Sequence, residues 1–327
     1  MDIYEELSSI VADYINENSE LCDQTDDAEE MYMFDINNLL LTMNCSNIIL
    51  NERDFKFNPK NNVKYSLKQC DDLVEEFFGQ LNPSYLDYYR LRKSDGTVDF
   101  DFLCQQDQPY SGYDDSDNIT IYIPITSTIE DAFSIVHEVF HNYNLGNKES
   151  LTDGYLFTTE CLSYLCEFLF SDFLLSKGFN ESNDIILRDL YSLRRLALEF
   201  NFSLSLILKY LNNGYIDKYI VSDIISSYPD EYYDYLCYFI YDICDKGELN
   251  LDNAETYILS GLLSTYMYDR IRSNKKNLNE LFDLNDVLND YSLSQVLDYL
   301  DLDYTDCELT LNSYSVLRKS YKKFIKR

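Results

Sequence analysis

Glycine and proline are scarce in this chain, which contains only nine glycines and five prolines among 327 residues. Because both residues interrupt helices, long stretches remain in which apolar side chains recur with a helical period. We therefore expect a mostly α-helical fold with helices at residues 2–17, 65–80, 83–93, 128–144, 155–177, 182–212, 217–227, 231–245, 253–273, 286–300 and 310–326.

One segment departs from the helical period. "NITIYIPIT" (residues 118–126) alternates and is rich in β-branched residues, so it predicts a strand, with Pro124 at an edge or at the strand's end. A weaker extended pattern covers residues 97–103. We expect a small β-sheet among the helices. We divide the chain into an N-terminal helical segment (1–64), a central region (65–273) and a C-terminal helical segment (274–327), packed together as one unit.

The charge of the chain excludes two classes of partner. A net charge of −32 disfavours nucleic acid and anionic membranes, since both are polyanions. No apolar run approaches the ~20 residues that span a bilayer, and the acidic N-terminus lacks the pattern of a secretory signal. The nine cysteines include no CxxC pair and are interpreted as reduced thiols. We therefore expect a cytoplasmic protein.

Both histidines of the chain lie in "SIVHEVFHNY" (residues 134–143). "STIE" (127–130) has the form of a capping box that begins this helix, and Gly146 is a stop signal. The i, i+4 spacing places His137 and His141 on one helical face, where two imidazoles can bind one Zn²⁺. Glu138 lies about 100° round the helix, where a carboxylate can take a proton from a water that the metal activates.

A third ligand has to be a carboxylate, because no further histidine exists. The next predicted helix is almost wholly apolar, yet Glu160 and Glu167 share one of its stripes at i and i+7. A buried charge is costly unless it is paired or binds a metal. We assign Glu160 as the third ligand, while Glu167 supports a ligand or lines the cleft. The alternative is that both glutamates contact solvent and the histidines are ordinary core residues.

The segments "IPITSTIEDAFSIVHEVFH" and "TTECLSYLCEF" resemble the thimet oligopeptidase and oligoendopeptidase F family of zinc metallopeptidases, which are of the gluzincin type (HExxH plus a distant Glu). Glu160, Ser163 and Glu167 reproduce the family's Glu-x-x-Ser-x-x-x-Glu run. Weaker likeness extends the resemblance to residues 65–273. It implies a zincin-like helical catalytic domain in which the HExxH helix and the Glu-bearing helix line a cleft. It also places Tyr257 where the family has a tyrosine that stabilises the transition state.

The chain also departs from the family pattern. Phe140 stands where members usually have glycine, and we expect it to narrow the cleft. The histidine before the tyrosine helix and the long N-terminal helical region are missing or reduced. The spacing of HExxH and Glu160 also matches certain aminopeptidases, although their "GAMEN"-type stretch is absent.

The sequence therefore predicts a zinc-dependent metallopeptidase that hydrolyses short oligopeptides, with one Zn²⁺ per chain bound by His137, His141 and Glu160. Glu138 is the expected general base. Tyr257 is either an oxyanion donor or a packing residue, and Gly112 lies in "QPYSGYDD" (108–115), either a loop beside the cleft or an ordinary turn. The alternatives are a catalytically impaired zinc-binding relative with a binding or regulatory role and a protease toxin acting on one protein. The sequence predicts no oligomeric state.

Overall fold

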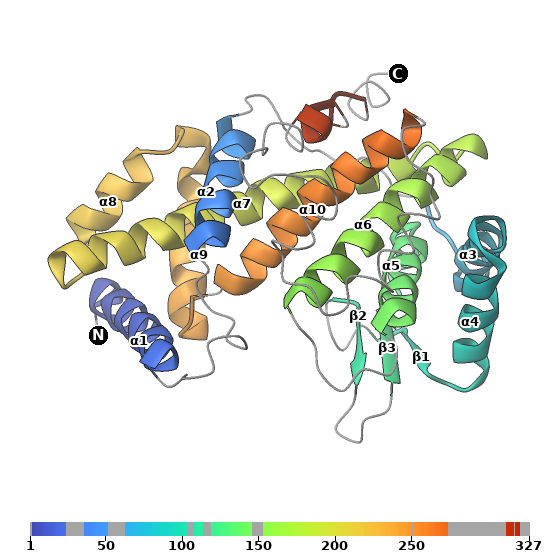
Figure 1. The fold of residues 1–327 in the computed structure, drawn as a ribbon, viewed down its shortest axis with the longest axis horizontal. Coiled ribbons are helices and arrows are strands. Elements are labelled where there is room, and N and C mark those ends of the chain that lie inside the picture. The colour runs from blue at the N-terminus through green and yellow to red at the C-terminus, as the bar shows by residue number, and fades with distance from the viewer. Residues whose placement is uncertain are drawn as a thin grey trace. The chain divides into compact units, whose positions relative to one another are not determined.

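The structure is a computed structural model, and it describes residues 2–23, 36–51, 63–103, 108–113, 119–145, 153–249, 251–273, 312–316 and 318–320 (Figure 1). The described residues are mostly helical and include a three-stranded sheet. The chain forms two compact units. Unit 1 contains Met1–Asp54 and Ser192–Ile258, and unit 2 contains Phe55–Tyr191 and Leu259–Arg327.

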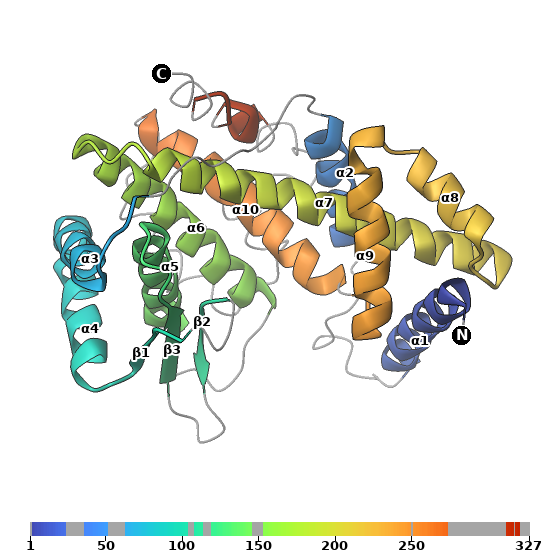
Figure 2. The ribbon, with the colours of Figure 1, turned by 180° about the vertical axis from the view of Figure 1, so that it is seen from behind.

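Unit 2 carries the sheet and the helices around it, which lie near one another in Figures 1 and 2. Its complete elements are α3 (Leu67–Leu81), α4 (Pro83–Ser94), β1 (Val98–Asp101), β2 (Tyr110–Tyr113), β3 (Ile119–Pro124), α5 (Glu130–Leu145) and α6 (Asp153–Ser176). Two further helices, α7 (Ser182–Asn213) and α10 (Leu251–Arg272), each have residues assigned to both units.

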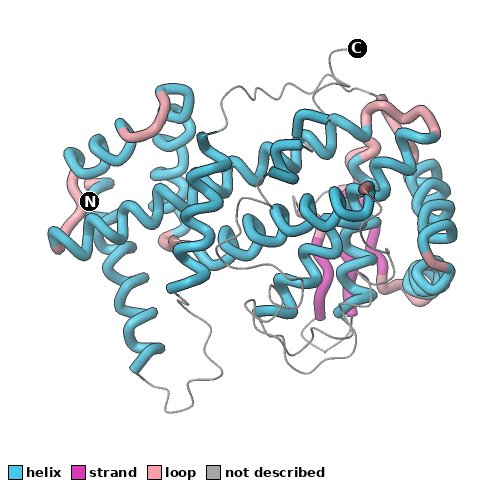
Figure 3. Tube along the Cα trace, turned by 45° about the horizontal axis from the view of Figure 1, so that its top comes forward, coloured by secondary structure: helices cyan, strands magenta, loops and turns pink. Residues whose placement is uncertain are grey.

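The sheet has the strand order β1-β3-β2, with β3 parallel to β1 and antiparallel to β2. Figure 3 draws the strands in magenta among the helices in cyan. Ile121 and Ile123 on the central strand are fully buried, as expected for a strand covered by a helix. That helix is α5, which packs against β3 and β2. The predicted strand at 118–126 is confirmed as β3, and Pro124 ends it.

The core of unit 2 is aromatic and lies around α5 and α6. Phe170 of α6 packs its ring against Phe77 of α3 and Phe133 of α5, with centroids 5.0 and 5.1 Å apart. The α3 helix begins at Ser66, whose hydroxyl accepts from the Gln69 backbone N–H while the Gln69 side chain accepts from the Ser66 N–H. These contacts hold the helix of the two histidines between the sheet and α6.

The described elements of unit 1 are all helices. The unit contains α1 (Ile3–Asp23), α2 (Ile36–Asn51), α8 (Lys218–Ser226), a 3₁₀ turn η1 (Asp230–Tyr232) and α9 (Tyr233–Lys246), with the adjoining parts of α7 and α10. The α9 helix packs on α1 and buries Leu236, Ile240 and Ile243. The helix ends at Gly247 in the left-handed conformation (φ 74°), which glycine adopts without steric cost.

Nine predicted helices, from 2–17 to 253–273, correspond to described elements. Eight of them agree within a few residues, while the prediction 2–17 ends before α1 does, at Asp23. The prediction at 286–300 lies outside the described residues, and of 310–326 only residues 312–316 and 318–320 are described, as helix. The α2 helix was not predicted. The interpretation of 108–115 as a loop or turn was wrong for Tyr110–Tyr113, which form strand β2.

The compact units group the chain differently from the three predicted segments, since Ser192–Ile258 belongs with the N-terminal part. The three-segment division stays a prediction about domains. Among the described helices, none combines the length and apolar character needed to cross a bilayer.

Candidate metal centre

The helix of the two histidines begins at a turn fixed by Asp131. The Asp131 carboxylate accepts from the backbone N–H groups of Thr126 and Ser127, each at 2.9 Å, and from the Thr126 hydroxyl at 2.7 Å. Ser127 has φ 61°, a left-handed conformation that costs free energy in a non-glycine residue. The Thr128 hydroxyl accepts from the Glu130 N–H at 3.2 Å. Asp131 and Thr128 thus organise this helix start, in place of the predicted pairing of Ser127 with Glu130.

His137 and His141 lie one turn apart on α5, with ring centroids 6.1 Å apart and ring planes at 61°. His141 is buried, and the His137 side chain is 15% exposed. The i, i+4 spacing therefore places both rings on the side of α5 that faces α6.

The Glu160 side chain of α6 reaches both rings. Its Oε1 lies 3.1 Å from His141 Nε2, and its Oε2 lies 3.5 Å from His137 Nε2. In a tetrahedral zinc site with bonds of about 2.0–2.1 Å, neighbouring ligand atoms lie about 3.3 Å apart. The three side chains that sequence analysis assigned to one ion are therefore brought together at separations of that size.

One buried atom at the centre of the cluster bears on the fit to zinc. Glu160 Oε2 is buried and makes no well-formed hydrogen bond within the described part of the chain. At the same time, no group of three His, Cys, Asp or Glu side chains among the described residues already has the arrangement of a metal site. The carboxylate contacts the rings directly, so an ion would take the place of these contacts. The donor set, two imidazoles and one carboxylate, is one that Zn²⁺ accepts.

Glu167 holds the outer nitrogen of His137. Its Oε1 lies 2.5 Å from His137 Nδ1, and its carboxylate is buried. Because Glu167 accepts from Nδ1–H, Nε2 is the ring nitrogen of His137 that faces Glu160 and that would bind a metal. Glu167 therefore lies where a residue that supports a metal ligand is expected.

Opposite charges stabilise one another inside this cluster. Burial favours the neutral ring of His137, yet the Glu160 and Glu167 carboxylates outweigh it and raise the pKa of His137 well above its usual value. Burial likewise opposes ionisation of Glu160, but its contacts with His137 and His141 lower the pKa of Glu160 far below its usual value. Without a metal, the cluster is a buried carboxylate–imidazolium network.

Glu138 is buried beside the cluster. Its burial raises the pKa of the carboxyl group, while the two histidines act in the opposite direction. Ser111 of β2 also acts to lower the pKa of Glu138, which places this strand near the carboxylate. A raised pKa brings a carboxylate closer to the range in which it accepts and returns protons near neutral pH.

The remaining predicted residues lie in different surroundings. Gly112 is on β2, and no heavy atom of the described residues lies within 4 Å of a Cβ built there, so there is open space beside it.

Phe140 is buried against the Tyr85 ring of α4, with centroids 5.0 Å apart, so it packs in the core and does not narrow a cleft as expected. Tyr257 is half-buried on α10 and belongs to unit 1, whereas the histidines belong to unit 2.

Sequence reasoning missed three side chains around His137. The Tyr164 ring packs edge-on against the imidazole, with centroids 5.4 Å apart. Arg188 and Asp189 of α7 are near enough to Glu167 for their charges to interact with its carboxylate. Tyr164 had a signal, because it follows Glu160 by four residues on the same helical stripe. Arg188 and Asp189 had none, since their helix is distant in sequence.

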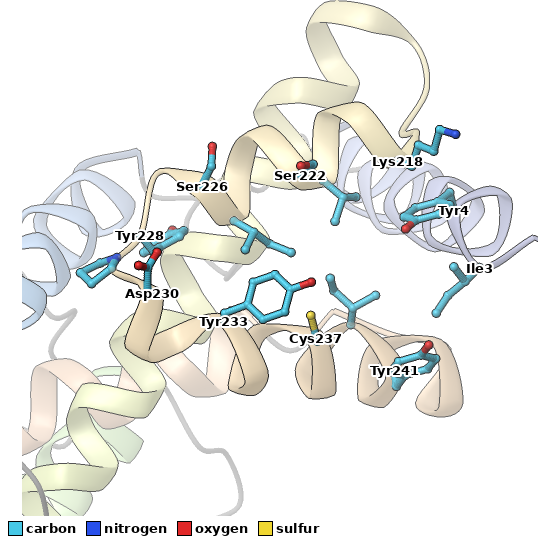
Figure 4. Close-up of a pocket in the computed structure, with 14 residues that line it drawn as sticks. Ile3, Tyr4, Lys218, Ser222, Ser226, Tyr228, Asp230, Tyr233, Cys237 and Tyr241 are labelled. Carbon is cyan, nitrogen blue, oxygen red and sulfur yellow. The ribbon is translucent and has the colours of Figure 1, made fainter.

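A separate pocket of about 450 Å³ lies within unit 1 between α1, α8 and α9 (Figure 4). Tyrosine rings line much of it, together with one thiol: Tyr4, Tyr228, Tyr233, Tyr241 and Cys237. None of the residues predicted for the metal centre lines this pocket.

Comparison with known proteins places the fold. No family model and no curated protein matches the sequence. Among solved structures, PZ peptidase A bound to an inhibitor is similar to this chain with a TM-score of 0.63 at 12% identity, over 88% of this chain and 59% of that one. A candidate peptidase from Chlamydophila abortus is similar with a TM-score of 0.56 at 16% identity, over 97% of this chain and 55% of that one.

At these identities the likeness shows the fold, which is that of structures described as peptidases. This chain spans a little over half the length of each of them. The thimet oligopeptidase and oligoendopeptidase F resemblance stays a prediction.

Proposed function

We propose that this protein is a zinc-dependent peptidase in which His137, His141 and Glu160 bind the metal ion. The observation that carries the proposal is the convergence of one buried carboxylate on the Nε2 atoms of both histidines, at 3.1 and 3.5 Å. Burying several ionisable side chains costs free energy, which pairing with one another or binding a metal ion offsets. The peptidase fold of the solved structures supports the same reaction class.

When bound, a zinc ion supplies Lewis-acid polarisation of a carbonyl group and lowers the pKa of its water from ~15.7 towards ~7. The chain's own residues supply the remaining parts. Glu138 accepts the proton of the attacking water and returns it to the leaving nitrogen of the peptide bond. Glu167 keeps Nδ1 of His137 protonated, so that Nε2 stays available as a donor atom. Ser111 of β2 lies near Glu138.

Glu138→Gln tests the proton-transfer role. The variant retains the shape of the side chain and leaves the three proposed ligands unchanged, so we expect it to bind zinc as the wild type does. Removal of the general base lowers hydrolysis by about 10²–10⁴-fold. Cleavage of a quenched-fluorescent peptide library, together with elemental analysis of the same samples, measures both quantities.

The wild-type controls separate the enzyme from its alternatives. Chelation should abolish cleavage, and one equivalent of Zn²⁺ should restore it. Cleavage that survives chelation, or an active Glu138→Gln variant, contradicts the proposal. Zinc binding without cleavage of any library peptide contradicts the hydrolysis of short peptides and favours a binding protein or a protease that acts on one folded substrate.

Tyr257 is proposed as a hydrogen-bond donor to the oxyanion, on the resemblance alone. Tyr257→Phe removes the hydroxyl and keeps the ring, so packing on α10 is preserved. Loss of one oxyanion donor typically costs about 2.7–4 kcal/mol of barrier, a decrease of about 10²–10³-fold in kcat. Steady-state kinetics on a cleaved library peptide measures the change, with Tyr266→Phe on the same helix as the matched control. Equal kcat in Tyr257→Phe and the wild type assigns Tyr257 to packing.

A further inference from the structure

Tyrosine rings and carboxylates surround two arginines of unit 1. The guanidinium carbon of Arg194, a buried residue of α7, lies 5.2 Å from the centre of the Tyr232 ring. Its Nη2 lies 3.3 Å from Oε1 of Glu231, which is the neighbour of Tyr232 in η1. A guanidinium is planar and weakly hydrated, so it can stack on an aromatic face and pair with a carboxylate at the same time.

The second arginine of α7, Arg195, has the same kind of surroundings. Its guanidinium carbon lies 5.0 Å from the centre of the Tyr235 ring on α9, and its Nε donates to the Tyr235 hydroxyl at 3.1 Å. Its Nη2 lies 3.6 Å from Oε1 of Glu199. In both cases, therefore, a guanidinium of unit 1 is accommodated by a tyrosine ring together with a carboxylate.

The pocket between α1, α8 and α9 contains the same two components. Tyr228 and Asp230 lie at one end of it, and the Tyr233 ring reaches into it from α9 (Figure 4). Asp230 is exposed and Tyr233 is 57% exposed, so both are accessible to a ligand. The described residues that line the pocket include no arginine. A guanidinium that binds to this set would have to come from another molecule.

The charge around the pocket favours a cation. Residues 217–247, which span α8, η1 and α9, include seven acidic and two basic side chains. One of the two, Lys246, pairs with an aspartate of α9 at 2.8 Å. The other, Lys218, lies at the opposite end of the pocket from Asp230, with its Nζ 5.1 Å from the centre of the Tyr219 ring. A cation that approaches Asp230 therefore meets a negative potential.

The apolar part of the pocket suits the stem of a long side chain. Val221 of α8 and Ile240 of α9 line it and are buried. The volume of about 450 Å³ lies within the range of pockets that hold small ligands, about 300–1,000 Å³. Arginine combines an apolar stem with a guanidinium, so it matches both the apolar wall and the acidic end of the pocket.

We propose that this pocket binds an arginine side chain of a basic peptide, with the guanidinium beside Asp230 and the rings of Tyr228 and Tyr233. Towards its other end the pocket continues between Tyr4 and Tyr241, where a residue that flanks the arginine can bind. The site lies within unit 1 and requires no metal ion. It goes beyond the proposed peptidase function and is tested independently of it.

Three peptides that differ in one side chain test the proposal. They have the form acetyl-Ala-Gly-X-Gly-Ala-amide, in which X is arginine, citrulline or lysine. Titrations followed by ligand-observed NMR give the dissociation constants for the full chain carrying Glu138→Gln. This substitution lies in unit 2 and prevents cleavage of the peptides if the chain is a peptidase.

We expect the arginine peptide to bind about 10–100-fold more tightly than the citrulline peptide. Citrulline keeps the shape of arginine but loses its charge, and with it the charge-assisted hydrogen bond and the cation–π contact. The lysine peptide should bind several-fold more weakly than the arginine peptide, because an ammonium does not stack on a ring.

Two substitutions in the pocket have matched controls on α9. Asp230→Asn removes the charge and should weaken binding of the arginine peptide about 10-fold, whereas Asp245→Asn, outside the pocket, should leave it unchanged. Tyr233→Leu removes the ring and should weaken binding about 3–10-fold, with Tyr238→Leu as its control. All four positions are exposed, so we expect the variants to fold as the parent chain does.

The proposal is overturned if the arginine peptide does not bind, if the citrulline peptide binds as tightly, or if Asp230→Asn leaves the binding unchanged. The last outcome would place the peptide elsewhere, for example at the metal centre. Equal binding of the lysine and arginine peptides overturns the assignment to arginine. Chelation should leave the dissociation constants unchanged, so failure of the proposed zinc chemistry does not alter this result.

Discussion

The helices α6 and α9 differ in the exposure of their charged side chains. In α9, apolar Leu236, Ile240 and Ile243 face the core, and Asp242 pairs with Lys246 one turn along at 2.8 Å with both side chains in partial contact with water. In α6, Glu160 and Glu167 are buried and contact two histidines of a neighbouring helix.

The difference in burial distinguishes carboxylates with a proposed role in the site from carboxylates that only form surface ion pairs. An exposed pair such as Asp242–Lys246 contributes at most about 0.5 kcal/mol and serves to solvate its helix. Burying a carboxylate costs several kcal/mol before any partner is counted. The α6 helix buries two carboxylates, Glu160 and Glu167, on one stripe. We infer that these two carboxylates have a role in the site, which the partly exposed Asp242 of α9 does not have.

Phe170→Ala tests the largest expected difference between α6 and α9, which is how tightly an aromatic side chain on each helix is packed. Phe170 is fully buried on α6 between Phe77 and Phe133, and its truncation leaves a cavity that should cost about 3–5 kcal/mol of unfolding free energy. Tyr241→Ala on α9 removes a ring that is 65% exposed, so its cost should stay within about 0.5 kcal/mol. Urea unfolding of the metal-free proteins measures both, and similar costs for the two variants contradict the packing of α6.

Glu167→Leu tests the next difference between α6 and α9, which is the effect of a buried carboxylate compared with a partly exposed one. Removing the carboxylate leaves His137 Nδ1 without its acceptor, and Zn²⁺ affinity should fall about 10–100-fold. Asp242→Asn is the matched control, and its Zn²⁺ affinity should equal that of the wild type. Isothermal titration with zinc provides the comparison. If both variants bind zinc as the wild type does, the buried and exposed carboxylates are equivalent and the distinction drawn here is wrong.

The helical spacing of apolar residues predicted most of the helices. The two elements that sequence analysis missed, α2 and β2, were missed for physical reasons. The α2 helix, "INNLLLTMNCSNIILN", clusters its apolar residues in runs without a clear polar face, so its period was not recognised. The β2 strand has four residues, "YSGY", and contains a glycine, which is unfavourable in a strand. It pairs with β3 along its whole length, so tertiary pairing determines its conformation.

For the candidate site, the sequence predicted which residues meet and missed what surrounds them. The spacing of His137 and His141 determines that they share a face, and a glutamate in an apolar helix has to find a partner. Asp131 and Asp189 could not be predicted in this way, because their contacts depend on the path of the chain before α5 and on the packing of α7 against α6. The roles of all these residues stay predictions.

The most direct measurement is the zinc content of the purified protein and of Glu160→Ala after dialysis against metal-free buffer. The account predicts one zinc ion per chain in the wild type and in the control Glu231→Ala, a surface glutamate of unit 1 that pairs with Arg194. It predicts little or no zinc in Glu160→Ala, since two imidazoles alone hold the ion weakly. A full equivalent of zinc in Glu160→Ala, or none in the wild type, contradicts it.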